Sequence, residues 1–253
     1  MRYFIYLSYF GKAYSGWQIQ QNALSVQQVV QEVLSSLLST EVFILGSSRT
    51  DKGVHAKQQV AHFDVMQPID LANLKYRLNR VLPADMGITA ICPVVDGAHA
   101  RFDASYRIYE YTIISHKDPF DRHTAFWLGH LPPLELLNQA AALFRIQADF
   151  EFFSKSSNQA KTFVCTIQES YWLQLGDKIV FRIQADRFLR GMVRAIVSAI
   201  LKVGSGKMCL DTLKKLIVKK PTERPGLTLV PPHGLTLVAV GYPEALFLKK
   251  NES

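Results

Sequence analysis

Residues 25–46, SVQQVVQEVLSSLLSTEVFILG, join a predicted helix directly to a predicted strand. Apolar residues in the first part recur at the spacing of one helix face; they are Val26, Val29, Val30, Val33, Leu34, Leu37 and Leu38. Ser25 is placed to cap this helix, and Gln28 completes a capping box. Residues 41–46 then form an apolar run typical of a strand. The stretch indicates a fold that mixes helices with strands.

The same mixture continues along the chain. We expect further strands over residues 3–9, 58–65, 87–94, 104–115, 161–174, 178–185 and 234–242. Further helices are expected over residues 70–80, 134–144, 187–204 and 211–220. Because most neighbouring strands can pair antiparallel, the expected class is α+β: two similar halves, a mostly antiparallel mixed sheet covered by helices, and a basic cleft between the halves. The expected domains are residues 1–100 and a basic C-terminal domain, residues 101–253.

Charge is uneven along the 253 residues, which carry a net charge of +8. Residues 1–104 hold 9 Lys and Arg against 8 Asp and Glu, whereas residues 105–253 hold 20 against 13. A basic half is a candidate surface for a polyanion such as RNA, although basic proteins without such a partner are common. No apolar run approaches the roughly 20 residues of a membrane helix. We therefore expect a cytoplasmic protein without a membrane partner.

Metal ligands have weak sequence support. The three cysteines are far apart and form no CxxC pair, which argues against a zinc knuckle and fits a reducing compartment. His55 and His62 lie seven residues apart, and ordinary polar histidines are a better interpretation of them than a metal pair. We expect no metal.

The motif SRTDKGVHA, residues 48–56, places charged groups in a turn-forming segment. Arg49 and Asp51 are two residues apart, so an extended backbone would point both to one face. A nearby guanidinium favours the ionised carboxylate, which is then ready to act as nucleophile or base. The alternative is a salt bridge within a turn, because aspartate is common in turns for local reasons.

Four further motifs accompany this one. They are YFGKAYSGWQIQ at residues 9–20, ARF at 100–102 with RIYEY at 107–111, FLRGMVR at 188–194 and HGLTL at 233–237. Together, and in this order, the five resemble the motifs of TruA-type tRNA pseudouridine synthases over nearly the whole chain. Three positions depart from that pattern: Lys52 stands where alanine is usual, Gly191 where histidine is common and Thr236 where an aromatic residue is common.

The resemblance implies an isomerase that converts uridine to pseudouridine in the anticodon stem-loop of tRNA, at positions 38–40, as a homodimer without metal or organic cofactor. It implies that Asp51 is the catalytic carboxylate and that Arg194 holds it in an ion pair. Tyr109 would lie against the flipped base, with Leu235 beside it, and Arg49 would occupy the vacated space. For Tyr109 the alternative is an ordinary core tyrosine of a strand.

Positive charge near these residues has two interpretations. Lys52 adds a cation beside Asp51 that is placed to contact an RNA phosphate. Arg187, Arg190 and Arg194 fall at i, i+3 and i+7 of the helix expected over 187–204, where they would form a basic stripe. Such a stripe is usually a solvated face, but the resemblance favours a site role for Arg194.

Two other functions fit the same residues. The first is a non-catalytic RNA-binding protein on this scaffold, which has no need of a carboxylate facing an anionic ligand. The second is a hydrolase of nucleosides that uses a second carboxylate, for which Asp186 and Glu110 are candidates.

Overall fold

Helices and strands mix throughout the computed structural model, which describes residues 1–155, 162–218 and 228–248. The class is α+β with mostly antiparallel strand pairing, as predicted. The chain divides into two compact units, the first made of residues 1–105 and 237–253 and the second of residues 106–236. In the described residues no helix is both long and apolar enough to cross a membrane.

The first unit is built on a sheet with the strand order β4-β1-β3-β10 and with β2 paired to β3. Its strands are β1 (Arg2–Tyr9), β2 (Leu45–Gly46), β3 (His55–Asp64), β4 (Met86–Val94) and β10 (Leu235–Gly241), the last of which enters this unit at Leu237. The strand β1 pairs antiparallel with both β3 and β4. Phe4 and Ile5 point to opposite faces of β1 and are both fully buried, so the middle of this sheet is covered on both faces.

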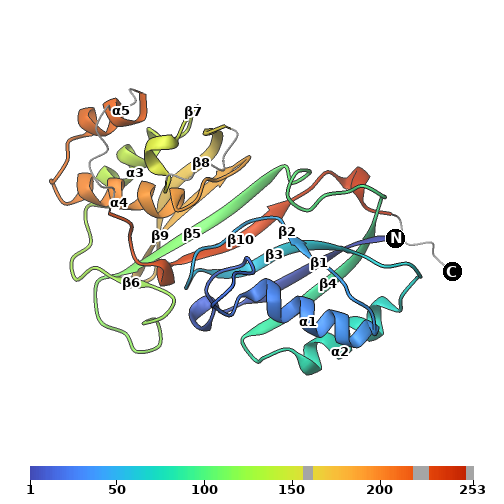
Figure 1. Cartoon of the computed structure of the whole chain (residues 1–253). Coiled ribbons are helices and arrows are strands. Elements are labelled where there is room, and N and C mark those ends of the chain that lie inside the picture. Colours follow the sequence, from blue (N-terminus) through green and yellow to red (C-terminus); the bar gives the residue numbers. More distant parts are fainter. Residues whose placement is uncertain (156–161, 219–227, 249–253) are drawn as a thin grey trace. The chain divides into compact units, whose positions relative to one another are not determined.

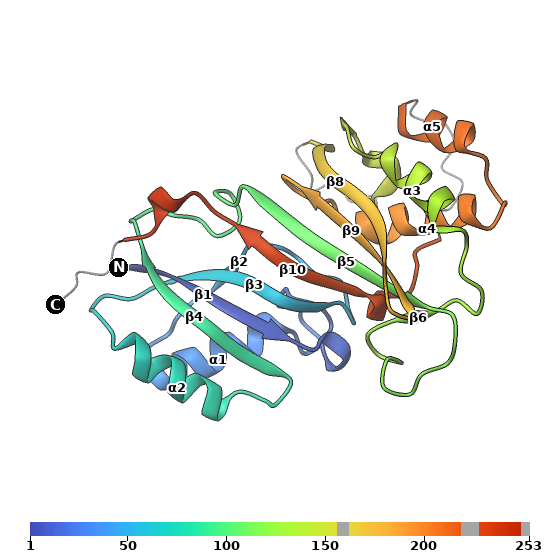
Figure 2. The same ribbon diagram turned by 180° about the vertical axis from the view of Figure 1, so that it is seen from behind.

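Two helices, α1 (Val26–Leu38) and α2 (Leu71–Val81), cover one face of this sheet (Figures 1 and 2). The predicted cap of α1 forms, because Ser25 Oγ accepts from the Gln28 backbone N–H at 3.2 Å. The reciprocal half of the capping box is absent, since the Gln28 side chain donates to Glu32 instead. Behind the sheet, the C-terminal segment with η4 (Glu244–Leu246) brings the rings of Tyr242 and Phe247 onto Phe4.

The strand expected over residues 41–46 is largely wrong, because only Leu45 and Gly46 pair as β2. Side chains of α1 satisfy the preceding backbone instead. Ser35 Oγ accepts from Val42 N–H at 3.0 Å, and Gln31 Oε1 accepts from Ile44 N–H at 3.2 Å. Residues 41–44 are therefore fixed to the helix rather than to a strand.

The second unit has the strand order β5-β9-β8-β7, with β6 parallel to β5. Its strands are β5 (Tyr106–Ile114), β6 (Phe126–Trp127), β7 (Gln147–Asp149), β8 (Val164–Leu175) and β9 (Lys178–Ala185). The helices are α3 (Leu134–Ala142), α4 (Met192–Gly204) and α5 (Leu210–Val218), which lie together on one face of this sheet (Figures 1 and 2). Short 3-10 turns complete the elements. The turn η1 (Gly11–Ala13) belongs to the first unit, and η2 (Glu151–Phe153) and η3 (Pro232–Gly234) belong to the second.

The helix expected over residues 187–204 begins five residues later, at Met192. Gly191 has φ +71°, a left-handed conformation that ends any continuous helix from Arg187. Asp186 also holds the segment before it, because its carboxylate accepts from the backbone N–H groups of Thr166 and Arg187 at 2.8 and 2.7 Å. The predicted helical stripe of Arg187, Arg190 and Arg194 therefore does not form.

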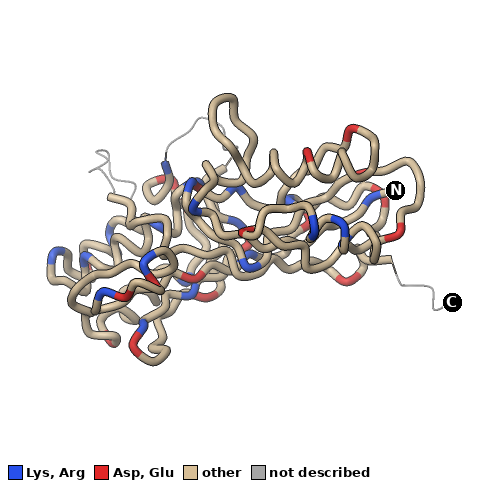
Figure 3. Tube along the Cα trace, turned by 90° about the horizontal axis from the view of Figure 1, so that it is seen from below, with Lys and Arg blue, Asp and Glu red and all other residues tan. Residues whose placement is uncertain are grey.

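The other predicted helices and strands form, with described ends displaced by at most three residues. The strands β6 and β7 were not predicted, and the last two residues of the helix expected over 211–220 lie outside the described residues. Lys and Arg number 18 against 11 Asp and Glu in residues 106–236. Figure 3 shows that the Lys and Arg residues of the described part of the chain are spread over many segments rather than gathered in one run.

Candidate active site

The motif SRTDKGVHA spans the loop between β2 and β3 and the first two residues of β3, and Asp51 is the first residue of the turn in that loop. The Val54 backbone N–H donates to the Asp51 carbonyl at 3.1 Å, which closes the turn. Arg49 and Lys52 are exposed, whereas the Asp51 side chain is half-buried. Thr50 is buried between them, so the loop presents the charged groups and anchors the residue that separates them.

Buried polar groups hold this loop from below. Thr50 Oγ1 shares a hydrogen bond of 2.9 Å with the hydroxyl of Tyr9. Ser47 Oγ donates to Gln59 Oε1 at 2.6 Å, and Gln59 Nε2 donates to the Ser48 carbonyl at 2.9 Å. Because each of these groups is paired inside the unit, the loop has a defined backbone path.

The segment 9–20 lies directly against the same loop. Trp17 N–H donates to the Thr50 carbonyl at 3.2 Å, and Gly11 N–H donates to His55 Nδ1 at 3.0 Å. Gly16 has φ +89°, and a Cβ on it would overlap the Thr50 carbonyl oxygen. The motif YFGKAYSGWQIQ therefore supports the backbone that carries Asp51, a role that its sequence did not indicate.

Tyr109 lies on β5 in the second unit and is 6% exposed. Its ring meets the Phe188 ring edge to face, with centroids 5.1 Å apart. Phe188 is half-buried in the irregular segment before α4. Sequence reasoning placed Phe188 on the apolar face of the expected helix and not in the site, although its place in FLRGMVR offered a signal.

Arg194 lies in the first turn of α4 and is anchored to the segment that leads into β10. Its Nε donates to the Val230 carbonyl at 2.8 Å, and the Tyr111 hydroxyl donates to the neighbouring Pro231 carbonyl at 3.0 Å. Burial raises the pKa of Tyr111, against the opposing charge of nearby Arg194, so the phenol stays a donor. Leu235 follows this segment and is 5% exposed.

The candidate residues thus fall into two groups. The structure places Arg49, Asp51 and Lys52 on one loop of the first unit. It places Tyr109, Arg194 and Leu235 in the second unit, on β5, on α4 and at the start of β10.

The two carboxylates considered for a hydrolase have structural partners. Glu110 Oε1 accepts from Arg182 at 2.9 Å across the paired strands β5 and β9. Asp186 accepts from two backbone N–H groups, and its carbonyl accepts from buried Arg107 at 2.7 Å. These contacts favour a structural role for both.

The histidines considered as a metal pair accept backbone hydrogen bonds. His55 Nδ1 accepts from Gly11 N–H, and His62 Nδ1 accepts from Ala100 N–H at 3.1 Å. Among the described residues, no group of three or more His, Cys, Asp and Glu side chains could hold a metal ion.

Comparison with known proteins gives this α+β fold and its aspartate-bearing loop a family. A family model described as tRNA pseudouridine synthase matches residues 140–243. A tRNA pseudouridine synthase A from Parabacteroides distasonis is 48% identical over 97% of this chain and 98% of its own length. Proteins of the same name from Porphyromonas gingivalis and Geobacter sp. (strain M21) are 44% and 35% identical, over 98% and 94% of this chain and 99% and 97% of their own lengths. The chain belongs to the tRNA pseudouridine synthase family, as the five motifs predicted.

Proposed function

We propose that this chain isomerises uridine to pseudouridine in the anticodon stem-loop of tRNA, at positions 38–40, with Asp51 as the catalytic carboxylate. The observation that carries the proposal is the Asp51 turn, which presents a carboxylate on a backbone held by Thr50, Trp17 and Gln59. A carboxylate costs affinity for an anionic ligand, so its presence in a chain of this family favours a chemical role.

The reaction needs no redox change. The bond between N1 of the base and C1′ of the ribose breaks, the base turns, and a bond between C5 and C1′ forms. One proton leaves C5 and one is gained at N1. We assign Asp51 the role of engaging the substrate carbon while the glycosidic bond is open.

The second unit supplies the remaining groups in this proposal. Tyr109 stacks on the flipped base and takes the C5 proton, and the Phe188 contact fixes the angle of its ring. Arg194 pairs with Asp51, and its bond to the Val230 carbonyl orients the guanidinium. Leu235 packs beside the base.

Two exposed cations on the Asp51 loop complete the assignment. Arg49 fills the space that the flipped base leaves, which offsets part of the unstacking free energy. Lys52 contacts an RNA phosphate. Both side chains are exposed and therefore accessible to a polyanion.

We also propose that the enzyme is a cytoplasmic homodimer. Light scattering after size-exclusion chromatography, with and without tRNA, measures the assembly. A monomeric mass under both conditions contradicts the dimer.

Release of tritium from tRNA labelled at C5 of uridine tests the activity. Wild type should release tritium, and Asp51→Asn should release none while its Kd for tRNA stays within about tenfold, or 1.4 kcal/mol. Asp96→Asn is the matched control, because Asp96 is an exposed acid of the same unit outside the proposed site. Loss of binding together with activity in Asp51→Asn would show a structural role for Asp51.

The alternative is a non-catalytic RNA-binding protein. It predicts salt-sensitive tRNA binding by wild type without tritium release from any tRNA. Mapping of the modified uridines in the active case decides whether positions 38–40 are the targets.

A further inference from the structure

An exposed phenylalanine stands on a tightly built turn of the first unit, outside the site described above. Phe102 is 74% exposed, and the guanidinium carbon of Arg101 lies 5.7 Å from its ring centroid. A cation at this distance is attracted to the face of an aromatic ring. The turn therefore offers an aromatic surface and a positive charge side by side.

Hydrogen bonds centred on His99 fix the backbone of this turn. His99 Nδ1 accepts from the N–H groups of Arg101 and Phe102 at 3.1 and 3.4 Å. Asp103 Oδ2 accepts from His99 N–H at 2.7 Å, and Asp103 N–H donates back to the His99 carbonyl at 3.1 Å. The His99 ring also contacts the Phe102 ring, with centroids 4.3 Å apart.

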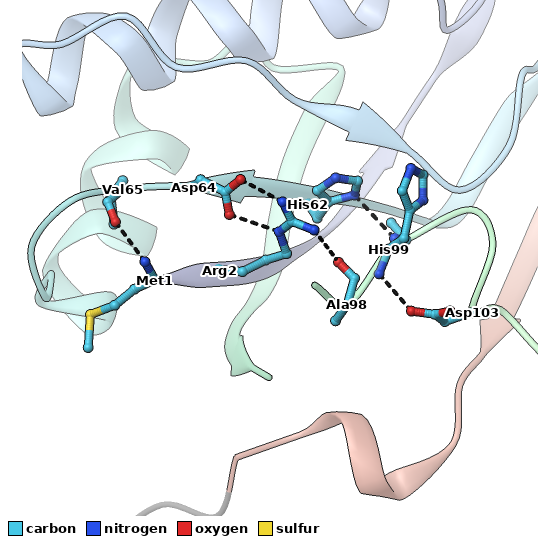
Figure 4. A network of polar contacts seen from close by, with 9 residues as sticks. Met1, Arg2, His62, Asp64, Val65, Ala98, His99 and Asp103 are labelled. Carbon is cyan, nitrogen blue, oxygen red and sulfur yellow. Dashed lines mark hydrogen bonds and ion pairs between the residues drawn. The ribbon is translucent and has the colours of Figure 1, made fainter. Parts of the chain in front are cut away.

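A second layer attaches the turn to the sheet, and Figure 4 shows much of it. Arg2 donates to the Ala98 carbonyl at 2.9 Å and is held in turn by both oxygens of Asp64. His62 Nδ1 accepts from Ala100 N–H at 3.1 Å, and the Tyr242 hydroxyl donates to the Ala100 carbonyl at 2.6 Å. Strands β1 and β3 thus hold the turn in place.

These contacts distinguish Phe102 from an exposed apolar residue such as Phe43 in the same unit. Phe43 is 65% exposed but makes no aromatic or cation contact among those found in the described residues. An exposed aromatic side chain on an already ordered backbone loses little further entropy when it binds a partner. Stacking on a nucleobase uses the ring surface, and an adjacent arginine can reach the phosphate next to that base.

We propose that Phe102 and Arg101 form an accessory RNA-binding site, in which the Phe102 ring stacks on an unpaired base and Arg101 binds the adjoining phosphate. The proposal rests on the proposed function only in that the RNA is tRNA. It assigns the pair to binding and not to chemistry. His99 and His62 act as positioning residues, because they hold the turn and do not touch the RNA.

Equilibrium binding of tRNA to full-length variants tests the stacking. Phe102→Leu should weaken binding about tenfold, because a base–aromatic stack is lost while an apolar side chain remains. Phe102→Trp should bind within about twofold of wild type, since a ring is retained. Phe43→Ala is the matched control for removal of an exposed phenylalanine and should bind as wild type does.

Heparin, a polyanion without bases, separates the two residues. Arg101→Gln should weaken binding to both tRNA and heparin and should lower the dependence of log K on log salt by about one. Phe102→Leu should elute from heparin at the same salt concentration as wild type. The circular dichroism spectrum and thermal midpoint of each variant confirm that it is folded.

Tritium release then assigns the effect to binding. Phe102→Leu should raise KM for tRNA about tenfold with kcat within about twofold of wild type. Equal tRNA affinities of wild type and Phe102→Leu, or a fall in kcat at unchanged KM, would overturn the inference. An absence of tritium release from wild type counts against the proposed function instead, because binding is measured separately.

Discussion

His62 should make the stability of the first unit depend on pH. The imidazole is 4% exposed, and its Nδ1 accepts from the Ala100 backbone, so this nitrogen cannot carry a proton in the folded turn. Burial first, and then the neighbouring His99 and Arg2, lower the pKa of His62 from 6.5 to about 4, although Asp64 and Asp103 oppose the shift. Protonation therefore opposes the folded turn.

The sign and size follow from linkage. Because the folded pKa lies below the unfolded value, the unfolded chain binds more protons between pH 6.5 and about 4. The contribution is complete above pH 6.5 and is lost as the pH falls toward 4. At pH 5 the loss is at most about 2 kcal/mol, taking about 1.4 kcal/mol per pKa unit.

The variant His62→Asn isolates this effect. Its side-chain oxygen can accept the Ala100 hydrogen bond in place of Nδ1, but it does not titrate in this range. Hydrogen exchange of the Ala100 amide, and urea unfolding followed by circular dichroism, should be compared at pH 7.5, 6.5, 5.5 and 5.0. The variant loses the packing of the larger ring at every pH, so the informative quantity is the difference in slope.

Wild type should lose about 2 kcal/mol more than His62→Asn between pH 7.5 and pH 5. His130→Asn, which removes an exposed histidine of the other unit, controls for the loss of any histidine. Parallel pH profiles for wild type and His62→Asn would refute the reasoning, because they would mean that His62 is protonated as readily in the folded turn as in the unfolded chain.

Three further predictions concern the site and its support. Gly16→Ala should lower the free energy of unfolding in urea titrations by more than about 2 kcal/mol, because it adds a clash with the Thr50 carbonyl to backbone strain. Gly129→Ala, at a similar φ of +81° but in open space, should lower it by about 1 kcal/mol. Ser25→Ala should lose about 1 kcal/mol through the cap of α1, and Ser25→Gly only a few tenths; equal losses would contradict the capping role. Tyr109→Phe should keep tRNA affinity within about threefold but reduce tritium release about 100-fold, and unchanged release would show that its hydroxyl takes no proton.

Local patterns predicted the elements whose own residues carry a helix or strand period, however far away their partners lie. The periodicity from Val26 to Leu38 placed α1 correctly, and Ser25 marked its start. The strand prediction for residues 41–44 failed because their backbone N–H groups donate to side chains of that helix. Hydrogen bonds of this kind leave no periodic pattern in the sequence. The predicted start of α4 was wrong because the apolar pattern does not reveal that Gly191 adopts φ +71°.

For the candidate site, sequence placed Asp51 in a turn but did not show what holds the turn. The support comes from Trp17 and Gly16, whose backbone approaches Thr50 from a segment more than 30 residues earlier. Motif order marked both segments without relating them in space. Only the folded unit shows that the motif at residues 9–20 stabilises the loop that carries Asp51.

The histidines of the first unit show why histidine spacing in the sequence does not reveal their role. His55, His62 and His99 each use Nδ1 to accept a backbone N–H of a loop or turn. A backbone amide has no sequence signature, so such a partner cannot be inferred from spacing, and a pair of histidines invites a metal hypothesis. A neutral imidazole fits this task because it both accepts a hydrogen bond and packs its ring, as His55 does on Phe10 and His62 on His99. The same chemistry therefore braces the Asp51 loop and the Phe102 turn, and it ties the geometry of both to the absence of a proton on Nδ1.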